Sequence, residues 1–551
     1  MKIILYQVFT RLYGNRNTNR VKNGTIEQNG CGKLNDFTPS VLKQMRETGI
    51  THVWYTGIIR HATVTDYSRY GIPRQHPAVV KGIAGSPYAI TDYYDVDPDL
   101  AVNVDKRMDE FDKLVNRTHR AGLKMIIDFV PNHVAREYKS IAKPAGVKDL
   151  GDGDNCELGF SPDNNFYYCP GQTFRPGFDL YHGQDTYYDE HPAKATGNDC
   201  FNNAPSKNDW YETVKLNYGV DYYAGRVGHF SPVPNTWEKM LDILLYWAAK
   251  GIDGFRCDMA EMVPAEFWAW ATAQVKNRYP NLIFIGEVYN PNEYRHYLSS
   301  GFDYLYDKVG MYDVMRDVIC HRRGTDAITW AWQMTDDIRD HMLYFLENHD
   351  EQRIASTFFA SNGQKAVPAL IVNALLQKNP FMFYAGQEYG ERGMDQEGFS
   401  GHDGRTTIFD YWSVDTLCRA ATGQLTEEEQ ALAAEYSKVL QIAAKEKAVT
   451  EGLSFDLMYV NAQYFRQYAF LRKSGKEMLL VVANFDDRDV TINLCIPSHA
   501  FDYLEIAEGD SIAEELLTGS SQELRLKRDG TVSLSLPKRN GVVFKLKIDK
   551  P

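Results

Sequence analysis

Eight short apolar segments recur along the first 450 residues, and this pattern constrains the fold more than any other feature. A strand that is buried on both faces forms a continuous apolar run, as in a parallel sheet covered by helices or closed into a barrel. These segments are Ile3–Phe9, Thr51–Ile59, Lys124–Val130, Gly254–Asp258, Leu282–Val288, Phe302–Val309, Met342–Leu346 and Phe381–Ala385.

Helical periodicity occupies several of the intervals between these runs. It covers Leu42–Glu47, Asp105–Ala121, Trp237–Lys250 and Val263–Tyr279, and Pro264 stands near the start of the last segment, where proline is tolerated. Strands that alternate with helices indicate an α/β protein with a parallel sheet. With eight strands, the sequence predicts a (β/α)8 TIM barrel formed by residues 1–133 and 221–454.

Two regions depart from this alternation. Residues 134–220 are rich in Asp, Asn, Gly, Pro and Tyr and lack helical periodicity, which predicts a small domain inserted after the third barrel strand. Residues 455–551 carry alternating apolar and polar positions, which predict a C-terminal antiparallel β-sandwich domain. The strands predicted in that domain are Met478–Phe485, Val490–Ile496, Thr531–Leu536 and Val542–Ile548.

Charge and cysteine content exclude several classes of protein. The chain has 60 Lys+Arg and 73 Asp+Glu, a net charge of −13, and no basic run, which argues against nucleic-acid binding. No apolar stretch approaches the roughly 20 residues of a membrane span, and the N-terminal run is shorter than a signal-peptide core. The eight cysteines include no CxxC pair. We therefore expect a cytoplasmic protein with free thiols; if it is exported, Cys156, Cys169 and Cys200 are candidates for a disulfide.

Acidic residues stand at the carboxyl ends of three predicted strands. Asp258 closes the fourth, Glu287 lies near the end of the fifth, and Asp350 follows the seventh. In a barrel these ends share one face, where active sites form. A pair of carboxylates there suits glycoside cleavage, in which one attacks the anomeric carbon and the other protonates the leaving oxygen. Arg256 precedes Asp258 by two residues, so both should face the same side and the cation should favour an ionised Asp258.

These segments, with their neighbours, resemble the four short motifs of the α-amylase family, glycoside hydrolase family 13. They read Asp128-Phe-Val-Pro-Asn-His133, Gly254-Phe-Arg-Cys-Asp258, Gly286-Glu-Val-Tyr289 and Glu347-Asn-His-Asp350. The resemblance implies that Asp258 is the nucleophile, Glu287 the general acid/base and Asp350 the carboxylate that stabilises the transition state. It also implies that Asp128 supports the site. The candidate substrate-binding residues are Tyr88, His133, Arg256, His349 and Arg353.

Three positions bear on specificity. Tyr88 matches an aromatic platform beneath the sugar at the cleaved bond, and Ala89 replaces an aspartate that often closes the pocket of exo-acting relatives. The resemblance therefore favours an open cleft and internal cleavage. Glu261 stands where many amylases have a lysine that contacts the next sugar, so the acceptor side of the cleft should differ.

The sequence also departs from the family at a calcium site that many amylases have. Asn132 matches one ligand, but Met262 and Lys215 replace two others, and neither a thioether nor an ammonium suits calcium. We expect this calcium to be absent, with Lys215 as an internal cation in its place. The loops Gly14–Asn19 and Gly151–Asn155 offer other oxygen clusters for calcium, although ordinary Asn/Asp turns are the stronger interpretation.

The sequence thus predicts a retaining α-glucan hydrolase that cleaves α-1,4 bonds in maltooligosaccharides or starch-like chains. Three alternatives remain open. They are a 4-α-glucanotransferase or a neopullulanase- or cyclomaltodextrinase-like enzyme with the same three acids, a catalytically inactive glycan-binding protein, and an unrelated metal-dependent barrel enzyme. Arg256 beside Asp258 disfavours the last. The oligomeric state is left open.

Overall fold

The computed structural model describes residues 2–178, 180, 187–393 and 401–547, and it contains a closed barrel of eight parallel strands. Around the barrel the order is β1-β16-β15-β14-β13-β12-β5-β2. All eight predicted strands are present. They are β1 (Ile4–Phe9), β2 (His52–Thr56), β5 (Lys124–Phe129), β12 (Gly254–Cys257), β13 (Ile283–Gly286), β14 (Tyr304–Tyr306), β15 (Met342–Phe345) and β16 (Phe381–Tyr384).

Side chains from alternate positions fill the barrel interior. Leu5, Trp54, Ile126, Ile285 and Met382 belong to one buried cluster that lies inside the strand ring. Their neighbours along each strand point outward to the helix layer, since successive strand residues face opposite sides. This double burial explains why the strands appear as unbroken apolar runs.

The second predicted run divides where the backbone turns. Strand β2 ends at Thr56, and a short strand β3 (Ile59–His61) pairs antiparallel with β4 (Ile90–Val96). Gly57 lies between β2 and β3 with φ +84°, a conformation that glycine adopts without steric cost. The β3–β4 pair, which the sequence reading missed, extends from the strand-end face of the barrel.

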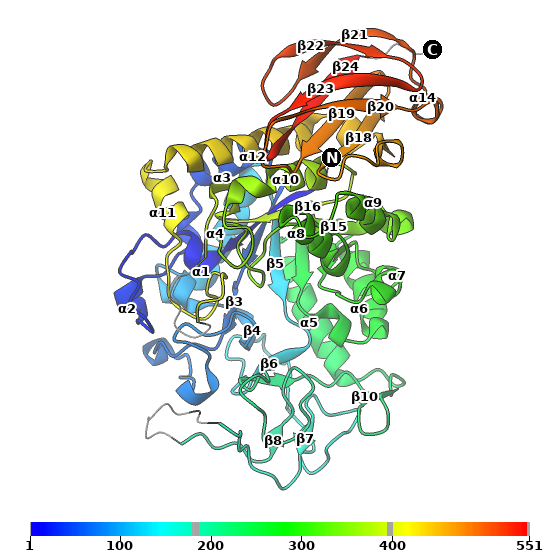
Figure 1. The fold of residues 1–551 in the computed structure, drawn as a ribbon. Coiled ribbons are helices and arrows are strands. Elements are labelled where there is room, and N and C mark those ends of the chain that lie inside the picture. The colour runs from blue at the N-terminus through cyan, green and yellow to red at the C-terminus, as the bar shows by residue number, and fades with distance from the viewer. Residues whose placement is uncertain (1, 179, 181–186, 394–400, 548–551) are drawn as a thin grey trace.

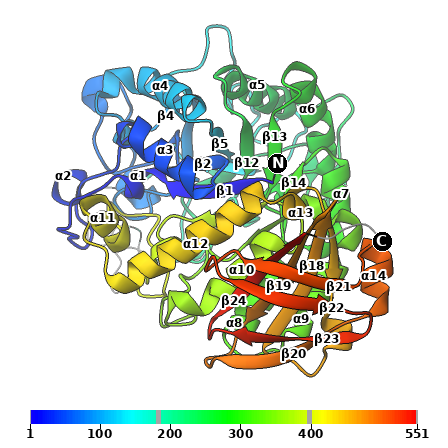
Figure 2. The same cartoon turned by 90° about the horizontal axis from the view of Figure 1, so that it is seen from above.

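The helices cover the outside of the barrel (Figure 2). The four predicted helices are observed as α3 (Pro39–Thr48), α4 (Arg107–Arg120), α5 (Asn235–Ala249) and α6 (Ala265–Arg278). Thr38 caps α3 by accepting a hydrogen bond from the Val41 N–H. Further helices complete the layer, among them α7 (Tyr294–Ser299), α8 (Asp313–Ile319), α9 (Asp326–Gln333), α10 (Val367–Leu375), α11 (Asp415–Thr422) and α12 (Glu427–Lys445).

The inserted segment and the C-terminal region lie at opposite ends of the barrel (Figure 1). The insertion follows β5, and its described residues form short strands: β6 (His133–Ala135), β7 (Tyr168–Cys169), β8 (Ala193–Lys194), β9 (Thr213–Lys215) and β10 (Val220–Asp221). Strand β10 pairs with β11 (Val227–Gly228), so this hairpin crosses residue 220, the predicted end of the insertion. Because the insertion leaves the carboxyl end of β5, it borders the face where the acidic residues stand.

The C-terminal domain is antiparallel, as predicted. A six-stranded sheet has the order β17-β18-β19-β24-β21-β22, and the pair β20-β23 packs against it. The predicted strands correspond to β19 (Glu477–Asn484), β20 (Val490–Ile496), β23 (Gly530–Leu536) and β24 (Asn540–Lys547); Ile548 lies outside the described residues. The sequence reading missed β17 (Leu453–Asp456), β18 (Gln467–Ser474), β21 (Gly509–Glu515), β22 (Ser521–Leu526) and α14 (Ser498–Leu504).

Within the described residues, no helix is long and apolar enough to cross a membrane.

Candidate active site

Asp258 and Glu287 occupy equivalent positions at the ends of adjacent strands. Each residue directly follows its strand, Asp258 after β12 and Glu287 after β13. The Asp258 N–H donates to the Phe129 carbonyl at 2.9 Å, and the Glu287 N–H donates to the Cys257 carbonyl at 3.1 Å. These bonds continue the parallel ladder beyond the assigned strands, so the two carboxylates begin from neighbouring points of the same rim.

The Arg256 guanidinium joins the two carboxylates. Its Nη1 lies 2.7 Å from Asp258 Oδ1, and its Nη2 lies 2.9 Å from Glu287 Oε2. Arg256 is fully buried and pairs in register with Asp128 of β5, whose Oδ1 is 3.8 Å from Nη1. The Arg256 Nε donates to the Tyr306 hydroxyl at 3.2 Å. One cation therefore holds both candidate reacting groups and is itself fixed from two other strands.

Two further donors orient the Glu287 carboxylate. The Met259 N–H donates to Oε2 at 2.8 Å, and the Tyr289 hydroxyl donates to Oε1 at 2.6 Å. Met259 has φ +42°, an uncommon conformation for a residue with a side chain, and it is this turn after Asp258 that aims its N–H at Glu287. Both Glu287 oxygens are thus positioned by the protein.

Asp350 is connected to the site through His349. The His349 Nε2 lies 3.1 Å from Asp350 Oδ2 and 2.6 Å from the Tyr88 hydroxyl, while its Nδ1 accepts from the Gln7 amide at 2.9 Å. The His349 Nε2 therefore faces both Tyr88 and Asp350. The Tyr88 ring stacks on the His349 ring at 5.2 Å. Tyr88 and His349 are therefore together, as the resemblance implies.

The three acids differ in their electrostatic surroundings. Burial raises the pKa of Asp258 well above its usual range; Arg256 lowers it, but Glu287 and Asp350 raise it further. The expected ion pair with Arg256 is present, yet the cost of desolvating the Asp258 carboxylate outweighs it in the free site. At Asp350, burial also raises the pKa, but His349 and Arg256 outweigh it and hold the pKa below its usual value. The Asp350 side chain is 42% exposed, so it faces the open side of the site.

His133 and Lys215 pair across the first strands of the insertion. Strand β6 pairs antiparallel with β9, with His133 opposite Lys215. Burial, with Lys215 and Lys81 nearby, lowers the pKa of His133 to about 3, so its imidazole is neutral at working pH. The His133 ring lies 5.3 Å from the ring of Trp210, a residue that the sequence reading did not single out.

Lys215 stands at the position where the resemblance implies a calcium ligand. Its Nζ is 2.8 Å from Asn132 Oδ1 and 2.6 Å from Asp199 Oδ1, and the side chain is 2% exposed. It also lies 5.4 Å from the centre of the Tyr222 ring. The Lys215 ammonium lies between two oxygen acceptors, at the position that a calcium ion would occupy. Its positive charge would repel that ion. The residues present therefore do not fit calcium at this place.

The two other loops that offer oxygen ligands use those oxygens within the protein. In the first loop, Asn15 Oδ1 accepts from the Asn17 N–H and Asn17 Oδ1 accepts from the Asn19 N–H. In the second, both Asp154 oxygens accept backbone N–H groups, of Asn165 and Phe166. These are the contacts of ordinary turns.

Three other predicted positions lie apart from the carboxylates. The Arg353 guanidinium is buried and donates to Glu347, the Ala385 carbonyl and Thr406, so its hydrogen bonds are all within the protein scaffold. Ala89 packs in a small apolar cluster with Ala62, Val80 and Ala135. Glu261 accepts from the Tyr289 and Asn290 N–H groups at 3.2 and 3.1 Å, so its carboxylate holds the loop that carries Tyr289.

The sequence reading missed the residues that position the acids. Gln7, Trp54 and Tyr306 point into the barrel and contact His349 or Arg256. Tyr289 follows Glu287 by two residues, and strand alternation could have indicated that both face the same side. All eight cysteines are free in the structure, including Cys156, Cys169 and Cys200.

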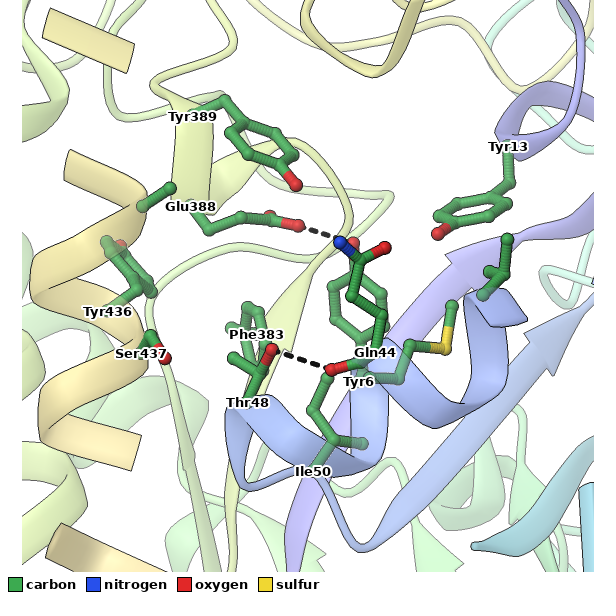
Figure 3. A pocket seen from close by; sticks show the side chains of 13 residues that line it. Tyr6, Tyr13, Gln44, Thr48, Ile50, Phe383, Glu388, Tyr389, Tyr436 and Ser437 are labelled. Atoms are coloured by element: carbon green, nitrogen blue, oxygen red, sulfur yellow. Dashed lines mark hydrogen bonds between the residues drawn. The ribbon is translucent and has the colours of Figure 1, made fainter. Parts of the chain in front are cut away.

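A separate cavity of about 120 Å³ lies between the barrel wall and the helices α3 and α12. Figure 3 shows Glu388 among tyrosine rings in this cavity. The Glu388 carboxylate accepts from the Tyr6 hydroxyl at 2.5 Å and from the Gly386 N–H at 2.9 Å. Burial raises the pKa of Glu388 to about 7, with little compensation from cations. Residues that line the cavity include Tyr13, Gln44, Thr48, Phe383, Tyr389 and Tyr436.

Comparisons with known proteins agree with this architecture. The family described as "Alpha amylase, catalytic domain" matches residues 7–451, and "Alpha amylase, C-terminal all-beta domain" matches residues 460–547. "Alpha-amylase 3" of Dictyoglomus thermophilum is 22% identical over 546 residues, covering 94% of this chain and 91% of the relative. A cyclomaltodextrinase of Bacillus sp is 22% identical and covers 90% of this chain and 75% of the relative. A maltogenic α-amylase structure from Thermotoga neapolitana shares the fold, with a TM-score of 0.65, 20% identity and 99% of both chains covered.

Proposed function

The chain belongs to the α-amylase family, as a glycoside hydrolase of the α-amylase type, and we propose that it cleaves α-1,4-glucosidic bonds of maltooligosaccharides or starch-like chains with retention of configuration. The observation that carries this proposal is the Arg256 guanidinium, which contacts both Asp258 and Glu287. Retention requires the two carboxyl groups to lie about 5 to 5.5 Å apart, close enough for one to attack carbon while the other serves the leaving oxygen. A shared guanidinium supports such proximity.

In the first step, the Asp258 carboxylate forms a bond to the anomeric carbon while the glycosidic C–O bond breaks. Glu287, protonated, gives its proton to the departing oxygen, and Met259 and Tyr289 hold its carboxyl group in place. In the second step, the Glu287 carboxylate takes a proton from water, whose oxygen attacks the same carbon and releases Asp258. The net reaction of the two steps is hydrolysis of the glycosidic bond by one water molecule.

Asp350, Tyr88, His349 and His133 form the proposed sugar-binding surface. Asp350 is held ionised by His349, so it can accept hydrogen bonds from sugar hydroxyls and stabilise positive charge at the anomeric carbon. We place a sugar ring against the Tyr88 ring, whose orientation is fixed by its stacking on His349. The neutral His133 can donate to or accept from a hydroxyl.

Digestion of maltoheptaose, pullulan and β-cyclodextrin, with products separated by length, tests this function. We expect shorter products from maltoheptaose, and we expect Asp258→Asn and Glu287→Gln each to lower kcat by at least about 10³-fold while the protein stays folded, as circular dichroism would show. Asp326→Asn, at the start of α9, is the matched control and should retain activity. Near-normal activity in either active-site variant would contradict the assignment.

Glycosyl transfer to a second sugar is the second candidate reaction. The similarity to a cyclomaltodextrinase also leaves cyclic α-glucans open as substrates of the same two-step chemistry. At this site Glu261 is engaged with the Tyr289 and Asn290 backbone, so it supplies no lysine-like contact to an acceptor sugar. Products longer than maltoheptaose in the same digest would indicate transfer in place of hydrolysis.

A further inference from the structure

A second pocket lies in the inserted segment, and none of its lining residues belongs to the candidate active site. Its volume is about 460 Å³, within the range of small-molecule sites in proteins. Strand β7 contributes Tyr168 and Cys169, and the β10 hairpin contributes Asp221 and Tyr223. The lining residues are Gly159, Phe160, Tyr168, Cys169, Pro170, Gln172, Phe201, Asp221 and Tyr223.

Four aromatic rings line this pocket, and one is largely open to solvent. Tyr223 is 56% exposed, whereas Tyr168 is buried and Phe160 and Phe201 are half-buried. The Tyr223 ring packs edge-on against Phe201 at 5.9 Å. A Cβ added at Gly159 would lie 3.4 Å from the Tyr223 ring, so the backbone passes close beside this ring and supports it. Tyr223 is therefore an exposed aromatic side chain whose ring is held in place by its neighbours.

Hydrogen-bonding groups stand beside these rings. The Asp221 Oδ1 accepts from the Tyr223 and Ala224 N–H groups at 2.9 and 3.0 Å, which fixes the carboxylate at the pocket wall. Gln172 is exposed at the pocket, and its side chain carries an amide that can serve a ligand. The Tyr168 hydroxyl donates to Asp154 at 3.0 Å, and this bond fixes the orientation of its ring.

From this combination we propose that the pocket is a second α-glucan-binding site, which holds a chain apart from the site of cleavage. Sugar rings present apolar C–H faces that stack on aromatic side chains, and their hydroxyls pair with carboxylate and amide groups. Among the described residues that line the pocket there is no Lys or Arg, which disfavours phosphate or another anion as the ligand. The choice of an α-glucan over other neutral sugars rests on the proposed function.

The location of the pocket suits such a role. The insertion leaves the barrel at the carboxyl end of β5, and Asp258 and Glu287 follow the carboxyl ends of β12 and β13 at the same rim. Phe201 of the pocket also contacts Tyr222 at 4.7 Å between ring centres, and Tyr222 faces Lys215, which pairs with His133. A polymer held here would remain close to the cleft, whereas a short oligosaccharide would gain little from the second contact.

Native electrophoresis through gels containing soluble amylopectin tests the proposal. The Asp258→Asn protein serves as the background, so that the polymer is not consumed. We expect amylopectin to retard this protein, and Tyr223→Ala to raise the apparent Kd at least about fivefold, as the loss of one stacking contact predicts. Phe160→Ala should act in the same direction. Tyr503→Ala, an exposed tyrosine on α14, is the matched control and should leave retardation unchanged.

Activity measurements with Asp258 intact separate this site from the active site. Tyr223→Ala should keep kcat/KM on maltoheptaose within about twofold of the unmodified protein while losing rate on granular starch. Equal retardation of the Tyr223→Ala, Tyr503→Ala and background proteins would overturn the proposal, and so would a background protein that amylopectin does not retard. If the unmodified protein failed to cleave maltoheptaose, the proposed function would fail, while retardation dependent on Tyr223 would still demonstrate the binding site.

Discussion

The Arg256 guanidinium lies 2.7 Å from the Asp258 carboxylate, and both groups are buried at the end of one barrel strand. The same guanidinium reaches Glu287 at 2.9 Å. Removing one partner from a buried ionic group leaves the remaining charges uncompensated, which is far more costly than losing a surface ion pair. Arg256 is therefore the residue on which the arrangement of the acids depends most.

Arg256→Lys should lower kcat/KM by at least about 10²-fold and shift its acid limb to higher pH. Asp258 must be ionised to attack, and burial already raises its pKa. A lysine ammonium cannot contact two carboxylates in the geometry of a guanidinium, so the pKa of Asp258 should rise further. The pH dependence of kcat/KM on maltoheptaose measures the shift, with Arg488→Lys at an exposed position as the control. An acid limb at the same pH in Arg256→Lys and the unmodified protein would contradict this account.

Chelation should leave the melting temperature and the activity of the unmodified protein unchanged if Lys215 takes the place of calcium. Lys215→Met removes the buried cation that bridges Asn132 and Asp199, and it should destabilise the protein by about 3 kcal/mol in urea unfolding. Lys207→Met, at an exposed position of the same segment, should cost little.

Lys215→Asp provides the converse test. It places a carboxylate beside Asn132 and Asp199, which creates a set of oxygen ligands that suits calcium. We expect added Ca²⁺ to raise the melting temperature of this variant and not that of the unmodified protein. A large loss of stability in the unmodified protein after exhaustive chelation would show that Lys215 does not replace the ion.

Glu388 should make the protein less stable as the pH rises toward neutrality. Its folded-state pKa of about 7 lies above the ordinary glutamate value, so the native state binds the proton more tightly than the unfolded state does. The stabilisation is complete below the ordinary glutamate pKa and is lost as the pH rises through about 7. Glu388→Gln should flatten the free energy of unfolding across this interval, as urea titrations at several pH values would reveal. Glu47→Gln, at an exposed position of α3, should leave the pH dependence of the free energy of unfolding unchanged. An unchanged pH dependence in Glu388→Gln would contradict the assignment.

The barrel and the proximity of Asp258 to Glu287 could be predicted from the sequence for the same reason. Parallel strands buried on both faces are continuous apolar runs, and their carboxyl ends share one rim, so Asp258 and Glu287 could be placed together. The positioning contacts could not be predicted in the same way. Gln7 reaches His349 across a sequence separation of 342 residues, a contact that depends on barrel closure.

Other features required the packed structure. The cavity around Glu388 forms only when α12 packs beside β1 and α3, and the chain contains no local pattern that signals it. Arg353 stands three residues after Asp350, yet its guanidinium turns toward Glu347 and the backbone, because a buried guanidinium needs acceptors for its N–H groups. Spacing along the chain did not reveal that orientation.

The most direct test of the central claim is the anomeric configuration of the first product. Asp258 and Glu287 are proposed to act by two successive displacements, which restore the original configuration at the anomeric carbon. Time-resolved ¹H NMR of maltoheptaose cleavage, recorded before mutarotation, should show the α-anomer at the new reducing end. Initial release of the β-anomer would contradict the account.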